Sequence, residues 1–109
     1  MADPKIRHFQ VDLRLRPGLG FRGKRNYSLP LESNSSTGYS WTERERSVPS
    51  IVDVTHHYVQ LPGPPGTGGM DKWEFTALAS GKEIIKLAYA PEHDPDDVRE
   101  WVVISVNVQ

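Results

Sequence analysis

Proline and glycine occur along most of the chain, and this distribution is the strongest constraint on its fold. The chain has 109 residues with nine of each, and it contains no long apolar run at the helical spacing of about 3.6 residues. Long helices are therefore disfavoured. Apolar residues instead alternate with polar residues over short runs, which is typical of strands that bury one face. The sequence predicts an all-β protein.

Several alternating runs are separated by segments rich in turn-forming residues. We expect strands at residues 6–15, 27–31, 39–44, 51–61, 73–77, 85–89 and 101–108. The fourth of these should break or bend near His56. Pro30 has no amide proton to donate, so the second strand should lie at a sheet edge or carry a bulge. Short strands at this spacing are typical of an immunoglobulin-like antiparallel β-sandwich of about seven or eight strands.

The tryptophans and the chain length indicate one core. Trp73 and Trp101 alternate with polar residues on expected strands, so we expect them, like Trp41, to pack in the core or between the sheets rather than to form a ligand platform. A chain of 109 residues is close to the usual size of one domain. We therefore expect a single domain over residues 1–109.

Three turn-rich segments, at residues 34–38, 62–69 and 90–98, interrupt the strands. The first belongs to the stretch NSSTGYSW, in which Asn, Ser and Thr side chains can bond to nearby backbone and Gly38 can take a positive φ. Such a run can form the rigid tip that a binding loop requires, although an ordinary turn has the same composition. The three segments are alternate connections of the expected strand order, so they should emerge at one end of a sandwich.

Charge and composition disfavour several kinds of partner. The chain carries 13 basic and 14 acidic residues, for a net charge of −1, so nucleic acid and an anionic membrane are not expected to bind. Cysteine is absent, which removes disulfides and thiol chemistry. No apolar run reaches the length of a signal peptide at the N-terminus or of a membrane span. The compartment stays open between the cytoplasm and a processed vesicular or secreted form.

The titratable residues form no recognisable metal or catalytic motif. His56 and His57 are adjacent, so on a strand they point to opposite faces, and no third ligand follows at a zinc-site spacing. The acidic segment at residues 92–97 lacks the glycine and the ligand order of a calcium loop. A nucleophile elbow is also absent. We expect no metal, no cofactor and no enzymatic activity.

The turn-rich segments resemble the chagasin family of cysteine-peptidase inhibitors, which carries three loop motifs on an immunoglobulin-like sandwich. In the first motif, Asn-Pro-Thr-Thr-Gly-Tyr/Phe, the matching residues are Asn34, Thr37, Gly38 and Tyr39, with Ser35 in place of Pro and Ser36 in place of Thr. The second motif, Gly-x-Gly-Gly, is matched in full by Gly66, Thr67, Gly68 and Gly69.

The third motif of the family, Arg-Pro-Trp/Phe, is reduced in this chain. In the family it follows a Leu-x-Tyr pattern, which here ends at Tyr89, and only Pro91 of the next residues matches. The segment from Arg99 to Trp101 has the right end residues, but it lies further along the chain and resembles the start of the family's final strand. We assign Pro91, Glu92 and His93 to the third loop.

The resemblance implies a monomeric, reversible and non-covalent inhibitor of papain-like cysteine peptidases of the cathepsin or cruzipain type. It places residues 36–38 in the active-site cleft, with Asn34 holding the loop and Tyr39 packed beneath it. The glycine loop would add backbone hydrogen bonds beside the substrate groove, and Pro91 or His93 would contact the far side of the cleft. The alternative is a generic immunoglobulin-like adhesion or carbohydrate-binding module without inhibitory activity.

Overall fold

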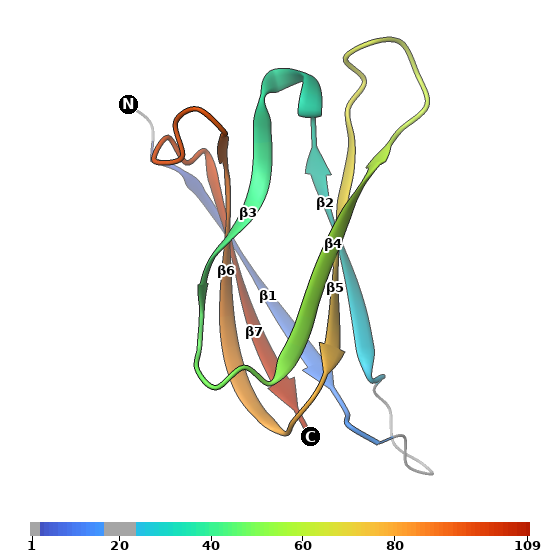
Figure 1. The fold of residues 1–109 in the computed structure, drawn as a ribbon, viewed down its shortest axis with the longest axis vertical. Coiled ribbons are helices and arrows are strands. Elements are labelled where there is room, and N and C mark those ends of the chain that lie inside the picture. The colour runs from blue at the N-terminus through green and yellow to red at the C-terminus, as the bar shows by residue number, and fades with distance from the viewer. Residues whose placement is uncertain (1–2, 17–23) are drawn as a thin grey trace.

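The computed structural model describes residues 3–16 and 24–109. Within these ranges it contains seven strands and one short 3₁₀ helix (Figure 1). The strands are β1 (Lys5–Leu13), β2 (Asn26–Ser33), β3 (Tyr39–Arg46), β4 (Val52–Gln60), β5 (Gly69–Ala77), β6 (Gly81–Pro91) and β7 (Glu100–Val108), and the 3₁₀ helix is η1 (Ser35–Thr37). The prediction of an all-β fold is confirmed.

The strands form two sheets that pack face to face as a sandwich (Figure 1). One sheet has four strands in the order β1-β7-β6-β3, and the other has three strands in the order β2-β5-β4. Neighbouring strands run antiparallel except for β1 and β7, which are parallel from Lys5 opposite Glu100 to Leu13 opposite Val108. Pro30 lies in β2, which is an edge strand as predicted.

The core lies between the sheets and is built by the alternation that the sequence predicts. Residues at every second position of β5, β6 and β7 are almost completely buried, among them Trp73, Phe75, Ile85, Leu87, Val102 and Ile104. Trp41 is also buried, with 3 % of its surface exposed. Each sheet therefore turns one apolar face inward.

The expectation that Trp101 packs in the core is wrong. Its neighbour Val102 is buried between the sheets, so Trp101 points to the opposite, outer face of the four-stranded sheet. There it is partly buried and lines a shallow groove of about 480 Å³ with Ile6 and Lys86.

Several predicted strand boundaries also need correction. β4 is continuous through His56, because every residue of the strand pairs with β5. Gly69 was expected in a loop but begins β5, where an added Cβ would lie 2.2 Å from the carbonyl oxygen of Val59. Pro91 was likewise expected in a loop but ends β6, opposite Tyr39. The expected turn after the first strand lies outside the described residues.

The connections β2–β3, β4–β5 and β6–β7 all lie at one end of the sandwich (Figure 1). These are the three turn-rich segments, so the prediction that they emerge together is confirmed. We call them the first loop (residues 34–38), the second loop (residues 61–68) and the third loop (residues 92–99), and we call this end of the molecule the loop end.

The opposite end is held by a buried carboxylate. Glu83 is 1 % exposed, and its two oxygens accept hydrogen bonds from the Arg46 Nε atom and the Ile51 backbone N–H, each at 2.7 Å. Arg46 also donates to the backbone oxygen of Val52 at 2.6 Å. This network ties the β3–β4 connection, which crosses between the sheets, to β6.

Candidate functional site

The first loop is a single turn of 3₁₀ helix with a cap at each end. Asn34 is the N-cap, with φ −128° and ψ 98°, and its Oδ1 atom accepts hydrogen bonds from the backbone N–H of Ser36 at 3.1 Å and from its hydroxyl at 2.6 Å. Gly38 closes the turn at φ 80°, and its N–H donates to Ser35 at 3.2 Å. The turn chemistry noted in the sequence therefore produces a compact, self-bonded tip.

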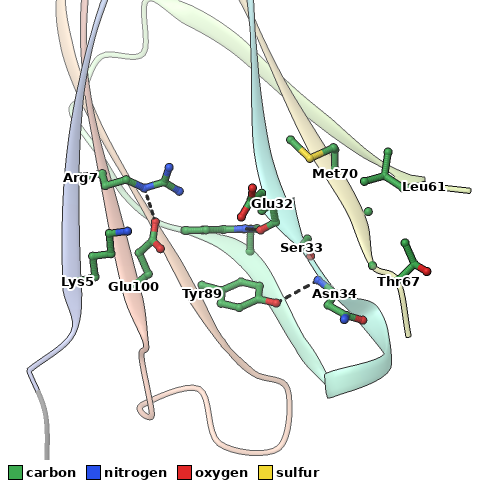
Figure 2. Close-up of a pocket in the computed structure, with 13 residues that line it drawn as sticks. Lys5, Arg7, Glu32, Ser33, Asn34, Leu61, Thr67, Met70, Tyr89 and Glu100 are labelled. Carbon is green, nitrogen blue, oxygen red and sulfur yellow. Dashed lines mark hydrogen bonds and ion pairs between the residues drawn. The ribbon is translucent and has the colours of Figure 1, made fainter. Parts of the chain in front are cut away.

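Asn34 connects this tip to the rest of the loop end. Its Nδ2 atom donates to the backbone oxygen of Gly66 in the second loop at 3.0 Å. Its backbone N–H donates to the Tyr89 hydroxyl at 3.2 Å (Figure 2). The role of Asn34 as the residue that holds the loop agrees with these contacts.

Thr37 is exposed at the tip, but its hydroxyl is occupied within the loop. The Oγ1 atom donates to the backbone oxygen of Asn34 at 2.6 Å and accepts from the N–H of Tyr39 at 3.4 Å. While the loop keeps this shape, the hydroxyl proton is not available to a partner. The residue as a whole remains exposed, so its other atoms can still contact a partner.

The second loop is shaped by positive-φ glycines and by hydrogen bonds within the loop. Gly66 and Gly68 have φ values of 89° and 85°, which favour glycine. The Thr67 N–H and hydroxyl both donate to Pro64, at 3.2 and 2.6 Å. Gly66 and Thr67 are exposed, whereas Gly68 and Gly69 are buried. Only the first two of the four predicted residues therefore present surface to a partner.

Gly68 is buried because it packs against the base of the first loop. An added Cβ would lie 3.3 Å from the backbone oxygen of Ser33 and 3.4 Å from the Asn34 side chain. Its own carbonyl oxygen accepts hydrogen bonds from Leu61 N–H at 3.1 Å and from Gln60 Nε2 at 2.8 Å. The first and second loops are thus in direct contact.

The third loop joins the same assembly through Glu92, whose N–H donates to the backbone oxygen of Gly38 at 3.3 Å. Glu92 and His93 are exposed, as a contact role requires, whereas Pro91 is buried at the end of β6. Pro91 therefore fixes where the loop begins and offers little surface. Arg44 of β3 donates to Pro95 at 2.8 Å and holds the middle of the loop.

An aromatic cluster lies beneath the three loops. Tyr89 stands between Tyr39 and Trp41, with ring centroids 5.5 and 5.0 Å away. The Arg99 guanidinium lies 5.7 Å from the Tyr39 ring centroid, and Asp97 together with Tyr39 raises the pKa of Arg99 above its ordinary value. Neither Tyr89 nor Arg99 was predicted to support the loops, although the Leu87–Tyr89 alternation indicates that Tyr89 faces the inside of the sandwich.

An open cavity of about 550 Å³ lies between the two sheets at this end (Figure 2). Tyr89 and Asn34 line one side, and the ion pair of Arg7 and Glu100, with 2.6 Å between Nε and Oε2, lines another. The loops are therefore supported by hydrogen bonds and aromatic contacts over a hollow rather than by a filled core.

His56 takes part in a different contact, below the first loop. Its Nδ1 atom lies 2.9 Å from an oxygen of the nearly buried Asp71, and its ring stacks on Trp73 with centroids 4.0 Å apart. Among residues 3–16 and 24–109, no group of three or more acidic, histidine or cysteine side chains is placed to hold a metal ion. The same ranges contain no helix with the length and apolar character needed to cross a bilayer.

Fold and site together define a class: an immunoglobulin-like sandwich that presents three mutually bonded loops at one end. The sequence matches the model of the Chagasin family peptidase inhibitor I42 over residues 22–106. The chain belongs to this family and is a peptidase inhibitor, not an enzyme. No curated protein sequence matches the chain.

Solved structures give the same fold. The solution structure of amebosin aligns over 99 % of this chain and 100 % of its own, with 24 % identity and a TM-score of 0.66. The cysteine protease inhibitor EhICP2 from Entamoeba histolytica covers 100 % of both chains, with 18 % identity and a TM-score of 0.67. PbICP-C, solved in complex with falcipain-2, covers 100 % of this chain and 96 % of its own, with 16 % identity and a TM-score of 0.67.

Proposed function

We propose that this protein is a reversible, non-covalent inhibitor of papain-like cysteine peptidases and that its three loops fill the active-site cleft. The observation that carries the proposal is the bonding between the loops: Asn34 to Gly66, and Gly38 to Glu92. These bonds make the loop end one preformed surface, and preformed surfaces bind tightly because little ordering is left to occur on association. The complex of PbICP-C with falcipain-2 supports an arrangement of this kind.

The shape of the first loop suits a cleft that cleaves extended peptides. A papain-like enzyme attacks a substrate carbonyl with a thiolate that is paired with a histidine. Residues 35–37 form a 3₁₀ turn, so their backbone curves and cannot lie extended over that thiolate in attack geometry. The small side chain of Ser36 and the absence of a side chain at Gly38 permit close approach. The tip would therefore occupy the cleft without being cleaved.

The other loops would flank the tip. Gly66 and Thr67 expose a backbone with little side chain, which can hydrogen-bond beside the substrate groove. Glu92 and His93 would meet the opposite wall of the cleft. We propose that residues 1–109 form one domain, because the family match covers residues 22–106 and each sheet combines strands from distant parts of the chain. We further propose that this domain acts as a monomer.

The test is an inhibition titration of papain with a fluorogenic peptide. The wild-type protein should inhibit stoichiometrically or with a submicromolar Ki, and Thr37→Asp should lose most of this inhibition, because it places a charge at the tip that the cleft must desolvate. Thr55→Asp is the matched control, since Thr55 is exposed on β4 away from the tip and its variant should inhibit like the wild type. Wild-type protein without effect at micromolar excess would refute the proposal.

A further inference from the structure

The first loop connects the two sheets, so its shape depends on how far apart they are held. It begins after Ser33, the last residue of β2 in the three-stranded sheet, and ends at Tyr39 in β3 of the four-stranded sheet. Elsewhere the separation of the sheets is set by close-packed apolar side chains. At the loop end the cavity of about 550 Å³ interrupts that packing. Other contacts must fix the separation there.

Two hydrogen bonds cross between the sheets at this point. Trp41 of β3 donates from Nε1 to the backbone oxygen of Glu32 at 3.0 Å. The hydroxyl of Tyr89, on β6, accepts the backbone N–H of Asn34 at 3.2 Å (Figure 2). The Trp41 and Tyr89 rings pack against each other, 5.0 Å between centroids. Both residues thus hold the end of β2, and Tyr89 holds it at the residue that caps the tip.

We infer that Tyr89 is a positioning residue for inhibition: its hydroxyl fixes Asn34, and through Asn34 the tip that enters the peptidase cleft. This inference rests on the proposed function. Without the hydroxyl, the end of β2 gains freedom to move over the cavity, and the tip adopts the binding shape for a smaller fraction of the time. The apparent inhibition constant rises in inverse proportion to that fraction.

Tyr89 is suited to this role because it can act without contacting the peptidase. It is partly buried beneath the loops and forms part of the cavity wall, so removal of its hydroxyl leaves the outward surface unchanged. Its ring contacts with Tyr39 and Trp41 depend on the ring alone. Tyr89→Phe therefore changes one hydrogen bond and keeps the packing.

The experiment compares Tyr89→Phe with the wild type. Loss of one net hydrogen bond raises the ratio of opened to closed tip about three- to tenfold, and this factor is the largest rise in Ki that the variant can show. The melting temperature should fall by about 5 °C or less, because the same bond is lost from the folded state. The Asn34 amide should exchange with solvent faster by a similar factor, while core amides such as that of Val106 keep their wild-type rates. Tyr27→Phe is the control, because Tyr27 is 42 % exposed near the start of β2, at the far end of the molecule.

A double-mutant cycle separates action through the first loop from action through the third. The effect of Tyr89→Phe on Ki should shrink in a Thr37→Ala background, which removes the Thr37 side chain from the tip together with its hydroxyl bond to Asn34, and it should persist unchanged beside His93→Ala. An unchanged Ki in Tyr89→Phe, or an effect that disappears only beside His93→Ala, would overturn the inference. Wild-type protein that fails to inhibit would instead refute the proposed function, and the Asn34 exchange rate would still decide whether Tyr89 holds the tip.

Discussion

Asn34 allows the contribution of loop order to inhibition to be measured. Asn34→Ala removes the acceptor for Ser36, which caps the 3₁₀ turn, and the donor to Gly66, which joins the first two loops. Loss of a cap costs about 1 kcal/mol, and loss of the bond between the loops costs about another 1 kcal/mol. Their sum of about 2 kcal/mol sets an upper limit of about 30-fold on the weakening of inhibition, which is reached when the loop of the free variant is mostly opened.

Asn34→Asp separates the contribution of the cap from that of the hydrogen bond between the loops. An aspartate keeps an oxygen that accepts from Ser36, but it loses the donor and faces the carbonyl oxygen of Gly66. We therefore expect a Ki about fivefold above the wild-type value, the equivalent of about 1 kcal/mol. Asn107→Ala, in β7, is the control for an asparagine outside the loops.

The assay is a Ki determination on papain, with melting temperatures to confirm that every variant is folded. If the Ki of Asn34→Ala is within twofold of the wild-type Ki, the order of the first loop does not limit binding. If Asn34→Ala and Asn34→Asp raise Ki equally, the cap contributes nothing to inhibition, and the contact between the loops accounts for the whole rise in Ki.

Three further predictions concern other parts of the molecule. Glu83→Ala should lower the free energy of unfolding by about 3 kcal/mol in urea melts, because it removes the carboxylate partner of the partly buried Arg46 and leaves the buried N–H of Ile51 without its acceptor. Gly69→Ala should give little folded protein by circular dichroism, because the new Cβ would lie 2.2 Å from the Val59 oxygen. His93→Ala should raise Ki on papain more than Trp101→Ala does, since Trp101 lies on the outer sheet face; the reverse order would show that the third loop is misassigned.

The strands could be predicted because they depend on the local alternation of apolar and polar residues. The grouping of the loops could be predicted because every second connection in a sandwich lies at the same end. Alternation marked the buried faces of β5 and β6, and alternate connections of a sandwich share one end. Alternation also marked the buried face of β7, because its residues Val102, Ile104, Val106 and Val108 are all apolar. Trp101 shares the other face with Ser105 and Asn107, so it was misplaced because a large aromatic side chain was expected in the core in spite of this pattern.

The missed features of the loop end depend on contacts between residues far apart in the sequence. The hydrogen bond of Tyr89 to Asn34 spans 55 positions, and nothing in either local sequence indicates the other partner. The capping role of Asn34, by contrast, acts over two positions and follows from its side chain. Alternation also carries no information on strand direction, so the parallel pairing of β1 with β7 was not foreseen.

That pairing has a consequence for how the molecule assembles. Within the described residues β1 lies at a sheet edge and forms its ladder with β7, so this ladder cannot form during synthesis until β7 has been made. Closing so long a stretch of chain is slow compared with forming the hairpins in between. Until β1 docks, this edge of β7 has unpaired backbone groups, which is the kind of edge to which a strand of another molecule can pair.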